Sequence, residues 1–217
     1  GLGKTWLSAF DTEQVDNCNR ILFVAHRDEI LNQSLSTYRK FYPRKSMGKF
    51  TGTEKDITAE VLFASVQTIS RKMNLSIFNR TDFDYIVMDE SHHTAAPSYV
   101  KVMNYFEPKF FLGLTATPDR MDKKNILQYY ENNMVFQMDQ EEAIKQGYLS
   151  NLVYKGMIDN IDYSNISYNG FKYDVNDLNK NLIIDKRDKA IIKKFKELGG
   201  KKRTIAFCAS IEHADHC

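Results

Sequence analysis

Short apolar runs separated by longer amphipathic or polar stretches divide this chain into strands and helices. Runs that are apolar throughout, without alternation, are typical of parallel strands buried on both faces. Residues Ile30, Leu31 and Leu35 then recur on one face of a helix that continues to Phe41. The pattern predicts an α/β fold in which helices flank a parallel sheet. The four clearest strand candidates are Ile21–Ala25, Val61–Ala64, Tyr85–Met88 and Phe110–Leu114.

Weaker patterns complete the predicted order of elements. Asp139 is a typical helix N-cap and Gly147 a typical residue after a helix end, so a helix is predicted over residues 139–146. The pair Asn169-Gly170 favours a hairpin within residues 166–173. A helix is predicted over Lys186–Leu198, ending at Gly199-Gly200. Another helix should begin within Thr5–Phe10, and further strands are predicted at Met47–Phe50, Met134–Met138, Leu149–Ile158 and Thr204–Cys208.

Two carboxylates follow the third apolar run directly. Asp89 and Glu90 come immediately after Tyr85–Met88, at a predicted carboxyl end, and open α/β sheets bind their ligands at that edge. Hydrolysis of a nucleoside triphosphate needs two acidic roles there. Asp89 would hold Mg²⁺, and Glu90 would orient or deprotonate the attacking water. The alternative for this pair is a solvated strand end.

The first five residues, GLGKT, supply the complementary half of such a site. Gly1 and Gly3 would let main-chain amides approach phosphate oxygens. Lys4 would reach the β and γ phosphates, and the Thr5 hydroxyl would bind Mg²⁺. Taken alone, the pentapeptide also fits an ordinary glycine turn before a helix. Together with the two acids, in this order along the chain, it predicts a site for ATP and Mg²⁺.

Composition narrows the class of protein without naming a partner. With 217 residues and 42% hydrophobic content, the chain suits one globular domain, or one and a fraction. A net charge of +2 is too mild to indicate nucleic-acid binding by bulk charge, so such a surface requires local clustering. Three cysteines are too few for a disulfide framework. We expect a cytoplasmic protein with no membrane partner.

Two clusters raise the question of a zinc site, and neither is favoured. The first cluster lies too close together along one strand end for its side chains to converge on one ion; it comprises Asp89, Glu90, His92 and His93. The second cluster, Cys208, His213, His216 and Cys217, is divided between a predicted strand end and a helix start. Mg²⁺ is therefore the one metal expected.

Several segments together resemble the motifs of superfamily-two helicases. The segments similar to motifs I, Ia, Ib or Ic, II and III are, in that order, GLGKT (1–5), ILFVAHRDEIL (21–31), VLFASVQTIS (61–70), VMDESHH (87–93) and LGLTATPDR (112–120). A further segment, TIAFCAS (204–210), resembles motif IV. The resemblance is greatest to the DExH branch, which includes restriction-enzyme motor subunits. It implies a RecA-like P-loop NTPase domain and the start of a second one.

The resemblance also implies which residues contact nucleic acid. Arg27 would bind a phosphate, although a helix-capping role or an ion pair with Asp28 or Glu29 is an equal alternative. Gln67 and Thr68 would bind phosphate or sugar without reading bases, and a helix cap is the competing role for Thr68. Ser210, in the segment similar to motif IV, is a further candidate. DNA is favoured over RNA as the partner.

Three other residues are implied to couple the ATP site to the nucleic-acid surface. His92 would form a short hydrogen bond to the segment similar to motif III, where Thr115 and Thr117 follow a strand. If that strand neighbours the acid-bearing strand, the hydroxyls lie beside His92. Without the other motifs, a threonine-rich turn would be the simpler interpretation.

The resemblance predicts three parts of the chain. Residues 1–147 would form the first RecA-like motor domain, cut at the P-loop, residues 148–185 a connector with a β-hairpin, and residues 186–217 the beginning of the second domain. Motifs V and VI, with the arginine that stabilises the transferring phosphoryl group, would lie beyond residue 217. We therefore expect the 217 residues alone to hydrolyse no ATP.

The predicted function is an ATP-dependent helicase or translocase on nucleic acid. One alternative is the motor subunit of a type I or type III restriction endonuclease, with nuclease or specificity domains or subunits outside this chain. A nucleic-acid-binding module with a decayed ATPase is an alternative of another class. Lys4, Asp89 and Glu90 argue against it, because a decayed site has no need to retain them. A small-molecule kinase would not explain AHRDE, SVQT and TATP at successive strand ends.

Overall fold

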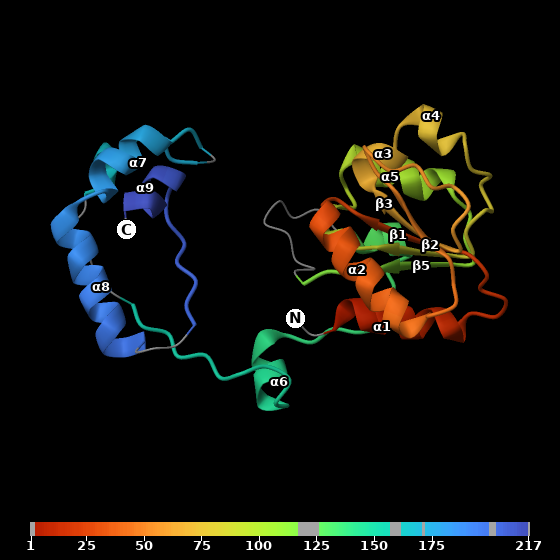
Figure 1. Ribbon diagram of the computed structural model, residues 1–217, viewed down its shortest axis with the longest axis horizontal. Coiled ribbons are helices and arrows are strands. Elements are labelled where there is room, and N and C mark those ends of the chain that lie inside the picture. Colours follow the sequence, from red (N-terminus) through yellow and green to blue (C-terminus); the bar gives the residue numbers. More distant parts are fainter. Residues whose placement is uncertain (1–2, 117–125, 157–161, 171, 200–202, 217) are drawn as a thin grey trace. The chain divides into compact units, whose positions relative to one another are not determined.

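The computed structural model describes residues 3–116, 126–156, 162–170, 172–199 and 203–216. The chain forms two compact units that divide between Asn151 and Leu152. Helices and strands alternate along most of the first unit (Figure 1), as the apolar pattern predicts. Its elements are α1 (Lys4–Asp11), β1 (Ile21–Ala25), α2 (Asp28–Phe41), β2 (Met47–Phe50), β3 (Val61–Ser65), α3 (Val66–Ile69), α4 (Lys72–Leu75), β4 (Tyr85–Met88), α5 (Pro97–Tyr105), β5 (Phe110–Gly113) and α6 (Gln140–Lys145), with 3₁₀ turns at Thr12–Gln14, Ser91–His93 and Ile126–Tyr130.

The five strands form one sheet in the order β2-β3-β1-β4-β5, and every pair in it is parallel. Val24 is paired with Met88, and Met88 in turn with Gly113. The carboxyl ends of β1, β4 and β5 therefore lie next to one another at one edge. The predicted α/β fold with a parallel sheet is confirmed.

Helices cover both faces of this sheet (Figure 1). On one face, Leu31 and Tyr38 of α2 share a buried cluster with Phe23 of β1. On the other, Ile69 of α3 and Val102 of α5 pack in a second cluster with residues of β1, β3 and β4. All five residues of β1 are fully buried, which explains why its sequence is apolar without alternation.

The described part of the second unit contains a 3₁₀ turn at Tyr163–Asn165, the helices α7 (Val175–Leu182), α8 (Asp185–Gly199) and α9 (Ile211–His216), and the segments that connect them. The predicted hairpin is present as a tight turn, because Tyr168 and Tyr173 form an antiparallel bridge and Gly170 has φ 88°. Only a residue tolerant of positive φ suits that position. The helix predicted over Lys186–Leu198 is confirmed as α8.

Three predicted strands are wrong in the part of the chain that the structure describes. Residues 134–138, 149–156 and 204–208 contain no strand, and residues 157–158 of the second prediction lie outside the described residues. Val135 is 83% exposed and Phe207 is 93% exposed. A strand needs a neighbour to take its main-chain hydrogen bonds. Within the described ranges, these apolar segments lie beside no strand that could provide one.

The helix-capping residues predicted around α6 agree with the structure, unlike the three predicted strands. The Asp139 carboxylate accepts a hydrogen bond from the Glu142 amide at 2.8 Å, and Gly147 after α6 has φ 78°. Both features were predicted from the sequence. No helix in the described ranges is long and apolar enough to cross a membrane. The three-part division into residues 1–147, 148–185 and 186–217 stays a prediction.

Candidate nucleotide and nucleic-acid site

Asp89 lies directly after β4, and its position is fixed by the sheet. Its amide donates to the Val24 carbonyl at 2.9 Å, which continues the pairing of β4 with β1 by one residue. The side chain is only 8% exposed, and its Oδ1 accepts a hydrogen bond from the Glu90 amide at 2.9 Å. Burial raises the pKa of Asp89 and the Glu90 carboxylate adds to this, whereas the Glu90 amide, Lys4 and His26 act in the opposite direction.

Glu90 has a left-handed backbone, with φ 51° and ψ 47°. This conformation is rare for residues other than glycine, asparagine and aspartate, and strained residues cluster at functional sites. It turns the chain out of the strand and into the 3₁₀ turn Ser91–His93. The Glu90 carboxylate is half-buried and lies 3.1 Å from Nδ1 of His92. The two acids therefore differ in setting, since Asp89 is buried and Glu90 is partly open to solvent.

His92 links the acid-bearing strand end to the end of β5. Its Nδ1 lies 3.1 Å from Oγ1 of Thr115. The Ser91 amide donates to the Leu114 carbonyl at 2.8 Å, and the Leu114 amide to the Met88 carbonyl at 2.9 Å. The contact between His92 and Thr115 that the sequence predicts is therefore present. Thr117 lies outside the described residues.

The glycine loop is described from Gly3 onward, and Gly1 lies outside the described residues. Gly3 has φ 74° and precedes α1. A side chain would strain this backbone, which explains a glycine immediately before the helix. Lys4 and Thr5 form the first turn of α1 and are both half-buried. The Lys4 ammonium lowers the pKa of the Asp89 carboxyl, although burial has the larger and opposite effect. That the loop lysine and the strand-end acid form one nucleotide site stays a prediction.

The predicted nucleic-acid residues of the first unit differ in accessibility. Arg27 is exposed and has no ion pair among the described residues, so the ion-pair alternative is not what the structure contains. Gln67 is exposed, and its Nε2 donates to the His26 carbonyl at 3.0 Å. Thr68 is only 5% exposed, and its hydroxyl accepts from the Ser65 hydroxyl at 2.8 Å. This bond holds the turn after β3, and a contact of Thr68 with nucleic acid stays a prediction.

Ser210 lies in the second unit and has a local structural role. Its hydroxyl donates to Oδ1 of Asn179 at 2.6 Å and accepts from the His213 amide at 3.0 Å. The second contact caps the N-terminus of α9. A contact of Ser210 with nucleic acid stays a prediction.

Two residues of the site were missed in the sequence. The Tyr99 hydroxyl of α5 lies 3.5 Å from the Asp89 carbonyl. The His26 ring lies edge-on to that of His93, with centroids 5.4 Å apart, and its Nδ1 is buried without a hydrogen-bond partner in the described part of the chain. The position of His26 after an apolar run was a usable signal. Tyr99 carried none, because its approach depends on the packing of α5.

Residues 1–120 match a family model described as "Type III restriction enzyme, res subunit" (ResIII), which covers more than half of the chain. The chain belongs to the ResIII family. Over 99% of its length, this ResIII chain is 26% identical to the type I restriction enzyme EcoAI endonuclease subunit of Escherichia coli. It is 32% identical, over 48% of its length, to the putative ATP-dependent helicase IRC3 of Saccharomyces cerevisiae.

The fold of this ResIII chain is that of a helicase motor domain. The crystal structure of the Pyrococcus furiosus Hef helicase domain aligns with 71% of the chain at a TM-score of 0.60 and 21% identity, and the alignment covers 36% of that structure. The chain spans 30% of the EcoAI subunit and 16% of IRC3. These findings confirm a superfamily-two, RecA-like motor domain.

Proposed function

We propose that the protein containing this chain is an ATP-dependent helicase or translocase that couples Mg²⁺-ATP hydrolysis to movement on DNA. The observation that carries the proposal is the junction at the end of β4. There a buried carboxylate, a second carboxylate in a left-handed backbone and a histidine bonded to the neighbouring strand end occur in four residues. The buried carboxylate suits Mg²⁺ binding and the second carboxylate suits orientation of the attacking water, which are the two acidic roles of phosphoryl transfer. The histidine connects them to the neighbouring strand end.

The chain's own residues suit a magnesium nucleotide. Mg²⁺ prefers hard oxygen ligands, which Asp89 and the Thr5 hydroxyl would supply. In the described part of the chain, the Glu90 amide is the one hydrogen-bond donor to the Asp89 carboxylate, which leaves oxygen lone pairs for a metal or its water. Lys4 would balance phosphate charge. The bound ion would supply electrostatic stabilisation of the transferring phosphoryl group.

Glu90 is the proposed base or orienting group for the attacking water. It is half-buried and partly open to solvent, so a water molecule can reach it. Nδ1 of His92 lies 3.1 Å from both the Glu90 carboxylate and the Thr115 hydroxyl, so the two groups share one ring nitrogen. A shift of the end of β5 would therefore move His92 and, through this one side chain, change the surroundings of the Glu90 carboxylate. We assign coupling to His92 and Thr115 on this basis, with Thr117 as a further proposed member.

Arg27 and Gln67 are the proposed contacts to nucleic acid in the first unit. Both are exposed at the carboxyl edge of the sheet, on the segments after β1 and β3. A guanidinium and a neutral amide suit phosphate and sugar contacts that position a strand without reading its sequence. DNA is proposed over RNA because a relative that is 31% identical over 47% of the chain is the putative DNA 3'-5' helicase Rad25 of Haloarcula marismortui.

The test separates nucleotide binding from hydrolysis in the complete protein. Glu90→Gln keeps the side-chain shape but removes the charge and the base, so we expect Mg²⁺-ATP binding within about threefold of wild type and a turnover loss of about 100-fold or more. Lys4→Ala should weaken binding itself. Glu107→Gln is the matched control, because Glu107 is exposed, pairs with Arg80 at 2.9 Å and precedes β5 at the opposite edge. Near-normal turnover in Glu90→Gln would refute the assigned role.

A second candidate function is specific to the family match. The alignment with the EcoAI endonuclease subunit covers 99% of the chain, which supports a restriction-enzyme motor. That function requires a nuclease domain or subunit elsewhere in the protein. Cleavage of DNA by the complete protein, dependent on ATP and lost in Lys4→Ala, would select it over a helicase without nuclease activity.

A further inference from the structure

The helix α8 carries most of the positive charge of a strongly basic segment. Residues 186–203 contain nine basic and two acidic residues, a balance of +7. The whole chain carries only +2, so the remaining residues sum to −5. Such concentration of charge is the local clustering that nucleic-acid binding requires and that the bulk composition conceals.

Four lysines of α8 form a stripe that runs along the helix over two adjacent sides. Lys186, Lys189, Lys193 and Lys196 are spaced by three or four residues, which places them on neighbouring turns. All four are exposed, and none has an ion pair within the described residues, whereas Lys194 pairs with Glu197 at 2.8 Å. Like charges one turn apart destabilise a helix. An anionic ligand would remove that repulsion.

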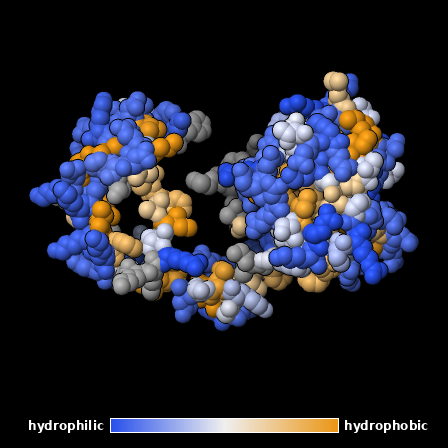
Figure 2. All heavy atoms as spheres, viewed as in Figure 1, coloured by the Kyte–Doolittle hydropathy of each residue, from blue (hydrophilic) through white to orange (hydrophobic). Residues whose placement is uncertain are grey.

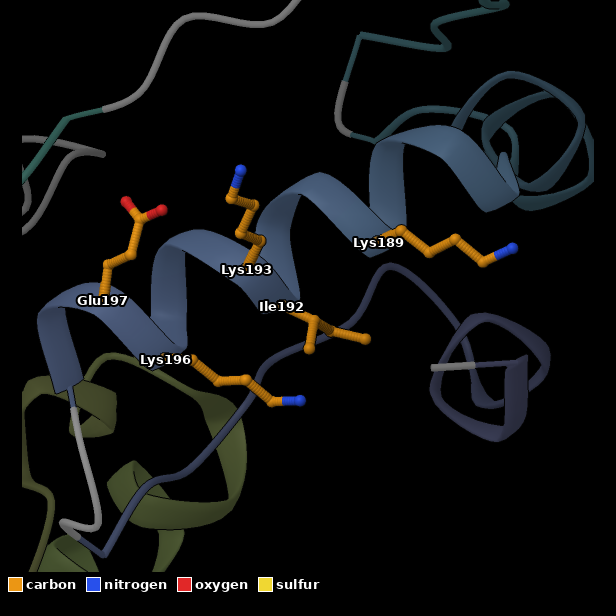
Figure 3. A pocket seen from close by; sticks show the side chains of 5 residues that line it. All are labelled: Lys189, Ile192, Lys193, Lys196 and Glu197. Atoms are coloured by element: carbon orange, nitrogen blue, oxygen red, sulfur yellow. The ribbon is translucent and has the colours of Figure 1, made fainter.

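An open depression of about 560 Å³ lies along this stripe. Figure 3 shows Lys189, Ile192 and Lys196 directed to one side of α8, with Lys193 and Glu197 on the adjacent side. At a rise of about 1.5 Å per residue, Lys189 and Lys196 are separated by about 10 Å along the axis. That length spans about three phosphates at about 3.4 Å of axis per strand.

We propose that the lysine stripe of α8 is a phosphate-backbone contact for a strand of nucleic acid. Lysine ammonium groups are mobile point charges, suited to phosphates and not to base edges. Binding should therefore be independent of sequence and strongly dependent on salt. This inference rests on the proposed function and adds a contact outside the motifs that the sequence singled out.

The proposed motor function favours nucleic acid over a membrane surface as the ligand of this stripe. An amphipathic basic helix can also lie on anionic lipid with its apolar side inserted. Asp188, near the start of α8, is 5% exposed and faces His213 and His216 of α9 at 3.7 Å and 3.4 Å. Apolar residues farther along the helix remain partly exposed, with Ile191 at 38% and Phe195 at 39%, so the test below includes lipid vesicles. Figure 2 shows hydrophilic residues over much of α8, with hydrophobic residues along one side.

The test compares two double variants of the 217-residue chain with equal loss of charge. Lys189→Gln with Lys196→Gln removes two members of the stripe, and Lys180→Gln with Lys194→Gln removes two exposed lysines of the same unit outside it. Binding of fluorescein-labelled single-stranded DNA is measured by anisotropy over a range of salt. The slope of log affinity against log salt concentration should fall by about 1.4 in the stripe variant, because each of two lost phosphate contacts on a single strand contributes about 0.7. If the two proteins bind equally at about 1 M salt, this corresponds to about 25-fold weaker binding at about 0.1 M salt. The control should lose much less.

Equal losses in the two variants would overturn the proposal, because only general charge would then matter. Binding to phosphatidylserine vesicles without binding to DNA would overturn it in favour of a lipid surface. ATP hydrolysis by the complete protein is measured separately. If DNA fails to stimulate hydrolysis while the stripe still binds DNA, the proposed motor function is refuted and the proposed DNA contact of the stripe is supported. If DNA stimulates hydrolysis while the stripe variant loses no affinity for DNA, the proposed motor function is supported and the proposed DNA contact of the stripe is refuted.

Discussion

Replacing Glu90 by glycine is expected to leave the first unit more stable than replacing it by alanine. Both substitutions remove the carboxylate and its contact with His92, so that contribution cancels between them. They differ in the Cβ atom, and the backbone at this residue is left-handed, with φ 51°. A Cβ in that conformation costs about 1–2 kcal/mol, whereas glycine adopts it freely. Glycine loses part of this advantage through its larger entropy in the unfolded chain.

The net difference should be about 1 kcal/mol in favour of Glu90→Gly. Urea unfolding followed by the fluorescence of Trp6, the one tryptophan of the chain, reports the first unit, since Trp6 lies in α1. At constant m-value, the shift in midpoint gives the difference in free energy of unfolding. Glu107, which has no positive φ, is the control position, and there glycine should be the less stable variant. Equal stability of the two variants at Glu90, or greater stability of alanine, would refute the inferred backbone strain.

Three further predictions concern single residues of the site. Burial raises the pKa of Asp89, so folding favours its protonated form. The free energy of unfolding of the wild type should therefore fall as the pH rises from the pKa of Asp89 in the unfolded chain to its pKa in the folded chain. Asp89→Asn cannot ionise and should be the more stable protein above that range, which urea unfolding at several pH values would reveal. Arg27→Ala should reduce the salt slope of DNA binding by about one phosphate contact, or about 0.7–0.9, and an unchanged slope would exclude a phosphate contact. Thr115→Val keeps the side-chain volume but removes the hydroxyl that contacts His92, so the rate of DNA-stimulated ATP hydrolysis should fall toward the unstimulated rate, and an unaltered stimulation ratio would remove Thr115 from the coupling path.

The sequence predicted those strands that are buried on both faces. Ile21–Ala25 is fully buried, and an uninterrupted apolar run has no stable alternative to such a position. The failed prediction at Thr204–Cys208 has equally suitable residues, and Phe207 there is almost fully exposed. Residue preference for strands depends on pairing and packing. It could not reveal that these segments lack a paired neighbour in the described part of the chain.

The site was predictable where a residue's position follows from the end of a strand. Asp89 and Glu90 had to lie at the carboxyl edge, and Thr115 had to approach His92 once β5 was a neighbour of β4. Thr68 differs, because a short helix turns its hydroxyl inward to Ser65. A capping role for Thr68 was an alternative in the sequence, but its burial and the left-handed backbone of Glu90 have no signature there. Both depend on how the following helix packs.

Steady-state ATP hydrolysis by the complete protein with Mg²⁺, measured in the presence and absence of DNA, tests whether this chain belongs to a motor on nucleic acid. We expect DNA to stimulate hydrolysis, Glu90→Gln to abolish both rates, and the matched variant Glu107→Gln to retain both. Hydrolysis that no nucleic acid stimulates would contradict a motor on nucleic acid. Stimulated hydrolysis that survives Glu90→Gln would show that the catalytic residue lies elsewhere.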